Sequence, residues 1–174
     1  PFVNNVFVHP HSSDGGTAVG AALELYHEKT GEPTVYQLTD SNLGVEYNDE
    51  EIEQALNQFE GQIEWEKHNG TLPAYVAGAL ADGKVIGWFQ GREEWGPRAL
   101  GRRSVLADPR DPNTREKINS SMKNRDWFMP FAPSCLEDKG DLVFKDFCES
   151  SFMTLAFDVV EGKESAVSSA IHVD

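Results

Sequence analysis

The sequence predicts an α+β fold, with an α/β-like arrangement in which strand-loop-helix units surround a mixed sheet. Three observations predict this class. Apolar residues recur at helical spacing over residues 52–59, and a second helical pattern covers residues 74–81. The second helix ends at Asp82-Gly83 and is followed by the apolar run 85–89, which predicts a buried strand. A loop rich in arginine and glycine follows that strand, so helix, turn, strand and loop alternate along the chain.

Composition limits the functional classes. The chain has 174 residues, of which 39% are hydrophobic, so it can bury a core as one domain or as two partial ones. It lacks a long uncharged apolar stretch, and we expect a cytoplasmic protein with no membrane contact. Two cysteines form neither a disulfide framework nor a metal quartet. The net charge of -14 opposes binding to polyanions, so nucleic acid is not expected as a partner.

The first segment predicts a strand over residues 2–8 and a helix that begins near Thr17. Between them lies the turn Asp14-Gly15-Gly16. A glycine turn at a helix start can bind a phosphate, and an aspartate there can bind a hard cation. Capping the helix is the commoner role of such an aspartate, and the residues alone favour it for Asp14. We assign no role to His9 and His11.

The middle of the chain contains a boundary and further elements. Glycine, proline, asparagine and aspartate accumulate over residues 30–47, which predicts the boundary. Asn48 or Asp49 is expected to cap the next helix, and residues 63–66 predict a short edge strand. Pro73 stands where the helix over residues 74–81 can start.

The last third predicts a strand over residues 105–107, a helix from Asp111 to about Met122, and a strand over residues 152–160. The aromatic segment 127–133 can stack an adenine, but a core with a rigid turn is the more common arrangement and is favoured here.

The loop over residues 91–104 is the main candidate site. It contains Arg92, Arg98, Arg102 and Arg103 among glycines. An arginine fork fits phosphate or carboxylate, and glycines allow backbone N–H groups to approach an anion. A basic turn paired with surface carboxylates is an equally good interpretation of these residues alone. Lys123 has two interpretations as well, a mobile charge for group transfer or a solvated helix end.

A longer set of residues extends this pattern along the chain: Gly91-Arg92, Glu94, 96–101, Arg103-Ser104, 107–112, Lys123, Arg125 and 130–133. This set resembles the O-carbamoyltransferase family of nodulation-factor and antibiotic biosynthesis. The resemblance departs at Arg102, where the family commonly has asparagine, and at Met129, where it usually has arginine.

The resemblance implies two domains. Residues 1–42 would be the C-terminal part of an ATPase-like (ASKHA-type) carbamoyl-transfer domain. Residues 43–174 would be a YrdC-like C-terminal domain that is incomplete at its C-terminus. We therefore expect a fragment that is inactive in isolation.

The resemblance also implies a reaction and a set of site residues. Such an enzyme binds carbamoyl phosphate and ATP with Mg²⁺, forms carbamoyl adenylate, and transfers the carbamoyl group to a hydroxyl of a small-molecule acceptor. Iron, or another divalent metal, is expected in the complete enzyme. The implied roles are Arg98 and Lys123 as catalytic residues, Arg92, Glu94, Arg103, Ser104 and Arg125 in substrate binding, Gly15 and Gly16 in nucleotide binding, and Asp14 as a metal ligand.

Two other classes are weighed against this enzyme. One is a non-catalytic module that binds a nucleotide or a sugar phosphate. The other is an RNA-binding domain, which the net charge of -14 opposes. The sequence leaves a homodimer open and does not identify the acceptor.

Overall fold

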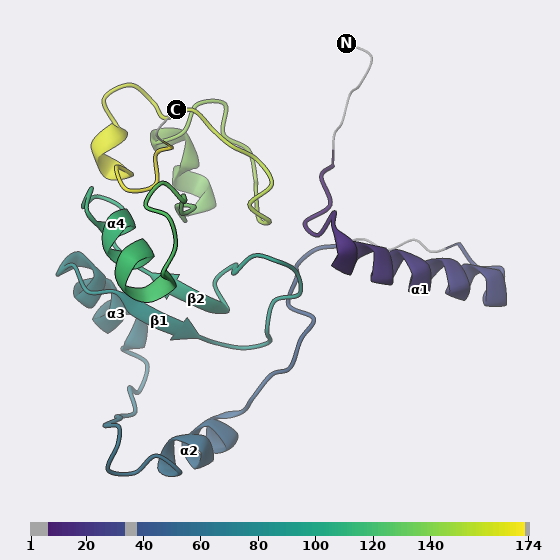
Figure 1. The fold of residues 1–174 in the computed structure, drawn as a ribbon, viewed down its shortest axis with the longest axis horizontal. Coiled ribbons are helices and arrows are strands. Elements are labelled where there is room, and N and C mark those ends of the chain that lie inside the picture. The colour runs from purple at the N-terminus through teal and green to yellow at the C-terminus, as the bar shows by residue number, and fades with distance from the viewer. Residues whose placement is uncertain (1–6, 34–37, 173–174) are drawn as a thin grey trace. The chain divides into compact units, whose positions relative to one another are not determined.

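The computed structural model describes residues 7–33 and 38–172, and Figure 1 shows their helices and strands. The chain forms two compact units. Unit 1 consists of Pro1–Glu46, Gln90–Arg103 and Ser150–Ala156, and unit 2 consists of Tyr47–Phe89, Ser104–Glu149 and Phe157–Asp174. The division into domains of residues 1–42 and 43–174 stays a prediction.

Unit 1 contains one helix, α1 (Asp14–Thr30), within its described residues. The helix begins at Asp14, three residues before the predicted start, and Ser13 rather than Asp14 occupies the N-cap position. The prediction that Asp14 caps this helix is therefore wrong. Gly31 ends the helix with a φ of 72°, and its N–H donates to the carbonyl of His27.

Residues 41–45, which follow α1 in the chain, pair with the loop over residues 91–104, called the arginine loop below. Backbone hydrogen bonds join Gly44 N to Glu93 O at 2.9 Å, Glu93 N to Val45 O at 3.0 Å, and Trp95 N to Ser41 O at 2.6 Å. These bonds satisfy the polar backbone of both segments without a regular strand. The arginine loop is thereby fixed against residues 41–45.

Unit 2 contains α2 (Asp49–Asn57) and α3 (Leu72–Ala81). Asn48 caps α2 through a capping box with Glu51, which confirms the predicted helix start. Pro73 lies in the first turn of α3, and Gly83 follows the helix with a φ of 78°. The predicted limits of this second helix are confirmed as well.

A two-stranded sheet pairs β1 (Ile86–Phe89) with β2 (Arg103–Leu106). Next come α4 (Thr114–Ile118) and a π-helical turn (Asn119–Lys123), where one longer α-helix was predicted. Two 3₁₀ helices, Glu137–Leu142 and Glu164–Ala166, complete the elements of the described chain. Helices with a small sheet agree with the α+β class.

Several strand predictions are wrong. Residues 63–66 form only an isolated bridge between Glu60 and Ile63, and residues 152–160 contribute only the bridge between Phe144 and Val159. The strand 85–89 exists, but Phe89 is 52% exposed, so it is not buried. Residues 7 and 8 are not in a strand, and the rest of that predicted strand lies outside the described residues.

The aromatic core also differs from the prediction. Trp127 and Phe128 are exposed by 63% and 43%, so these two residues of the 127–133 segment are not core. Phe144, Phe147 and Phe157 instead form an aromatic cluster in unit 2, with ring centroids 5.5 to 6.3 Å apart.

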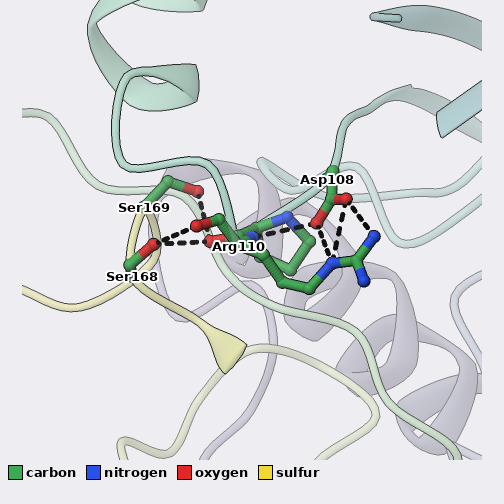
Figure 2. A network of polar contacts seen from close by, with 5 residues as sticks. Asp108, Arg110, Ser168 and Ser169 are labelled. Carbon is green, nitrogen blue, oxygen red and sulfur yellow. Dashed lines mark hydrogen bonds and ion pairs between the residues drawn. The ribbon is translucent and has the colours of Figure 1, made fainter. Parts of the chain in front are cut away.

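A polar network within unit 2 joins Ser168 and Ser169 to residues 108–110 (Figure 2). Ser168 Oγ donates to the carbonyls of Pro109 and Arg110 at 3.2 and 2.7 Å, and Ser169 Oγ donates to Pro109 O at 3.1 Å. The Arg110 guanidinium donates to the Asp108 carboxylate, and this hydrogen bond lowers the pKa of Asp108. Arg110 is thus a paired arginine outside the candidate loop.

Among the helices of residues 7–33 and 38–172, none has the length and apolar character required to span a membrane.

Candidate functional site

Glu94 closes the arginine loop. Its Oε1 accepts the backbone N–H groups of Leu100 at 2.7 Å and Arg102 at 2.6 Å, and the N–H of Arg103 lies 3.1 Å from Oε2. Partial burial raises the pKa of Glu94, but these backbone donors lower it by more, so the net pKa lies below its usual value. The carboxylate is therefore ionised at neutral pH. It joins Glu94, at the start of the segment 94–103, to backbone N–H groups near the end of that segment.

Three of the four loop arginines bind groups of unit 1. Arg92 donates to the carbonyls of Gly44 at 3.1 Å and Leu43 at 3.3 Å. Arg102 Nε donates to Asn42 Oδ1 at 3.3 Å. The Arg103 guanidinium donates to four backbone carbonyls, which belong to Gln90, Arg102, Gly91 and Val45. These hydrogen bonds hold the loop in place.

Arg98 differs from its three neighbours. Its side chain is exposed, and no hydrogen bond or ion pair joins its guanidinium to the residues that the structure describes. It lies within the segment that Glu94 closes, between Gly96 with a φ of 115° and Gly101 with a φ of 96°. Backbone conformations of this kind favour glycine at both positions. All five guanidinium donors of Arg98 are available to an anion.

The turn before α1 contacts the same loop. The Trp95 ring packs edge-on against His9 and His11, with centroids 5.7 and 5.0 Å away. A Cβ on Gly15 would lie 2.0 Å from His11 Cε1, and a Cβ on Gly16 would lie 1.9 Å from His11 O. His11 lies so close to the backbone at both positions that glycine is required at each of them. This requirement holds with or without a bound ligand. His9 and His11 thus link the predicted nucleotide-binding residues, Gly15 and Gly16, to the arginine loop. The sequence assigned no role to these two histidines.

A cavity of about 320 Å³ lies in unit 1 between α1 and the loop. Its wall is mainly apolar, with polar groups at His9, Glu93 and Glu94, and Val19, Leu23, Leu43, Gly44 and Trp95 complete it.

Asp14 is the predicted metal ligand at this turn. Asp14 is exposed on the first turn of α1 and can offer a carboxylate. Across residues 7–33 and 38–172, no three His, Cys, Asp or Glu side chains gather so that they could hold a metal ion. The described residues therefore do not fit a complete iron centre, and we derive no step through iron.

The other predicted site residues lie in unit 2. Ser104 is in β2, and Lys123 ends the π-helical turn as an exposed side chain. Arg125 stands two residues later, where its Nε donates to Asn119 Oδ1 at 2.6 Å. Asn119 is fully buried and was not singled out in the sequence, because an asparagine near a helix end has no distinctive pattern.

These features define a class of protein. An α+β scaffold carries, in unit 1, an exposed arginine without a hydrogen-bond partner among the described residues, on a loop closed by Glu94. In unit 2 it carries a lysine at the end of a π-helical turn and a held arginine two residues later. Positive side chains presented by rigid backbone are typical of proteins that bind small anions.

Comparison with known proteins gives the family. A family model described as "Carbamoyltransferase C-terminus" matches residues 77–174. The chain belongs to this family.

Relatives match the chain over nearly its whole length. It is 38% identical to the uncharacterized protein MJ1058 of Methanocaldococcus jannaschii, over 100% of this chain and 29% of that protein. It is also 38% identical to nodulation protein NolNO of Sinorhizobium fredii, over 98% of this chain and 25% of the relative. It is 35% identical to the 3'-hydroxymethylcephem-O-carbamoyltransferase of Amycolatopsis lactamdurans, over 98% of this chain and 30% of that protein. The chain thus spans about a quarter to a third of these relatives.

Proposed function

We propose that this chain forms part of an O-carbamoyltransferase that binds carbamoyl phosphate and ATP and transfers the carbamoyl group to a hydroxyl of a small-molecule acceptor. The observation that carries the proposal is Arg98, an exposed guanidinium without a protein partner in the described structure, on a loop closed by Glu94 in a member of this family. The acceptor class is inferred from the relative named 3'-hydroxymethylcephem-O-carbamoyltransferase, whose name describes carbamoylation of a hydroxymethyl compound.

The proposed reaction balances in three steps. Water releases inorganic phosphate from carbamoyl phosphate and leaves carbamate. A carbamate oxygen attacks the α-phosphorus of ATP, which forms carbamoyl adenylate and releases pyrophosphate. The acceptor hydroxyl then attacks the carbamoyl carbon, loses its proton, and AMP leaves.

The chain's residues have roles in binding and charge stabilisation. Arg98 binds a phosphate or carbamate oxygen through its fork, and Lys123 offers a mobile positive charge as the bond to phosphate breaks. Within unit 2, Ser104 donates a hydrogen bond and Arg125 binds a phosphate oxygen. Arg92, Arg103 and Glu94 act on the substrate through the loop, because their contacts are with backbone groups.

The nucleotide side of the proposal rests on the turn before α1. Gly15 and Gly16 leave room for close backbone approach at the N-terminus of a helix, where phosphate binding is favourable. Mg²⁺ bound to the triphosphate would neutralise its charge during attack. Asp14 would contribute one ligand to iron in a complete protein.

Calorimetric titration with carbamoyl phosphate tests the proposal. We expect saturable binding by the wild-type chain, in the presence or absence of ATP and magnesium, and at least a tenfold loss of affinity in Arg98→Ala, because a charge-assisted contact is worth about 1.5–3 kcal/mol. The Arg98 side chain makes no hydrogen bond or ion pair with the described residues, so the thermal midpoint should stay within about 1 °C, which corresponds to a few tenths of a kcal/mol.

Arg110→Ala is the matched control, because Arg110 is exposed but paired with Asp108 outside the loop. It should leave the affinity unchanged. A folded wild-type chain that does not bind carbamoyl phosphate, or an equal loss in both variants, would contradict the proposal. Binding without turnover in a complete protein would favour a non-catalytic phosphate-binding module instead.

A further inference from the structure

Asn119 is the most completely buried large side chain of the described residues, with an exposure of 0%. Its Nδ2 donates to the carbonyls of Trp127 at 3.2 Å and Met129 at 3.0 Å. Its Oδ1 accepts from Arg125 Nε at 2.6 Å. A buried amide is costly unless its groups are hydrogen-bonded, and here both ends of the amide are satisfied.

The backbone of Asn119 also binds Arg125. Asn119 begins the π-helical turn, and its carbonyl accepts the Arg125 N–H at 3.1 Å. The chain reverses through Asn124, whose φ of 46° lies in the left-handed region. π-helical turns are uncommon and often lie at functional sites. Asn119 therefore fixes Arg125 at its main chain and at its side chain.

The Arg125 guanidinium is restrained on further sides. It lies 4.5 Å above the centroid of the Phe131 ring, and its Nη2 donates to Pro130 O at 3.4 Å. The described hydrogen bonds use Nε and Nη2, and both Nη1 protons remain outside them. The fork is thus held in one orientation with donors left for a ligand.

We propose that Asn119 is a positioning residue that holds the Arg125 guanidinium ready to bind a phosphate oxygen of the substrate. This rests on the proposed function, in which Arg125 binds substrate. Holding the fork before binding removes the entropic cost of ordering a long side chain, so the ligand binds more tightly. The three contacts from Asn119 to residues 125, 127 and 129 also explain why a polar side chain occupies a fully buried position.

The first test follows the Nε–Hε group of Arg125 by NMR, without ligand. In the wild-type chain its hydrogen bond to Asn119 should give a resolved signal that exchanges slowly with solvent. Asn119→Leu, which keeps the number and branching of side-chain heavy atoms but has no acceptor, should broaden or remove that signal. Asn119→Asp keeps an acceptor and should keep the signal, so it serves if the leucine variant does not fold. Loss of the signal in the aspartate variant, or its absence in the wild type, would overturn the inference.

The second test is a double-mutant cycle measured as the dissociation constant for carbamoyl phosphate. Asn119→Leu should raise this constant about three- to tenfold, which is the factor for ordering one long side chain. In an Arg125→Leu background, Asn119→Leu should change the dissociation constant by less than about twofold, because the guanidinium is absent. Equal effects in both backgrounds would refute a role through Arg125.

Phe144→Leu is the control for general loss of stability, because it loosens the separate aromatic cluster of the same unit. It should lower the melting temperature without changing the affinity or the Arg125 signal. An affinity loss equal to that of Asn119→Leu would show that Asn119 has only a structural role. A folded wild-type chain that does not bind carbamoyl phosphate would refute the proposed function, and the Arg125 signal would still decide whether Asn119 holds the guanidinium.

Discussion

Replacing Glu94 with glutamine should loosen the arginine loop, because one carboxylate holds three backbone N–H groups. The Oε1 of glutamine can still accept from Leu100 and Arg102, but without a full charge, and its NH₂ would face the Arg103 N–H where Oε2 now accepts at 3.1 Å. Losing the charge should lower the free energy of unfolding by about 1 kcal/mol for each retained hydrogen bond. The glutamine NH₂ and the Arg103 N–H are both donors, and in a buried position their meeting should lower it by about 1–3 kcal/mol more. Partial solvent access reduces the sum to about 1–2 kcal/mol.

Thermal unfolding followed by circular dichroism measures this loss. For a chain of this length we expect the midpoint temperature of unfolding to fall by about 2–8 °C at pH 7. Glu93→Gln is the matched control, since it makes the same charge change one residue away and the described structure shows no hydrogen bond or ion pair of the Glu93 carboxylate. It should change the midpoint by no more than about 1 °C. Equal midpoints for the two variants would refute the reasoning.

The pH dependence gives a second check on Glu94. Its pKa is lowered in the folded chain, so the stabilisation is complete above the unfolded pKa of about 4.3 and is lost as the pH falls through the lower folded pKa. The midpoints of wild type and Glu94→Gln should therefore differ by a constant amount from pH 7 to about pH 5 and converge below that range. A difference that persists undiminished at pH 2 would contradict the proposed hydrogen-bonded carboxylate.

Two further substitutions address the helix starts. Asn48→Ala removes the capping box of α2 and should cost about 1 kcal/mol in chemical denaturation, whereas the exposed Glu50→Gln on the same turn should cost little. Gly15→Ala places a Cβ 2.0 Å from His11 Cε1, so the His11 ring must leave Trp95 and its NMR signals should shift; Gly20→Ala, on the same helix with nothing within 4 Å of its Cβ, should leave those signals unchanged.

The helices could be predicted because their signals are local. The Asn48 and Glu51 pair, Pro73 and Gly83 each act within one turn of the chain, and the structure places helix limits at these residues. The start of α1 was missed because Asp14 suits the first helical turn as well as the cap position. Only the backbone conformation of Ser13 distinguishes the two.

Strands and burial could not be predicted in the same way, because they depend on distant partners. Residues 152–160 have the composition of a strand, yet they find only the bridge at Val159. The apolar run 85–89 suggested burial, whereas its sheet has only two strands in the described chain and leaves Phe89 exposed. The buried position of Asn119 likewise depends on carbonyls eight and ten residues away.

The arginine loop shows how far composition leads and where geometry is needed. Its four arginines are equivalent in the sequence, and both an anion site and a structural turn explained them. The structure divides them: Arg92 and Arg103 bind backbone carbonyls, Arg102 binds the Asn42 side chain, and Arg98 has no hydrogen-bond partner among the described residues. The structural interpretation therefore applies to three of the arginines, and the anion site stays a prediction for Arg98. In a chain with a net charge of -14, an anion site at Arg98 would not depend on long-range attraction of anions, so its selectivity would come from the fixed shape of the loop.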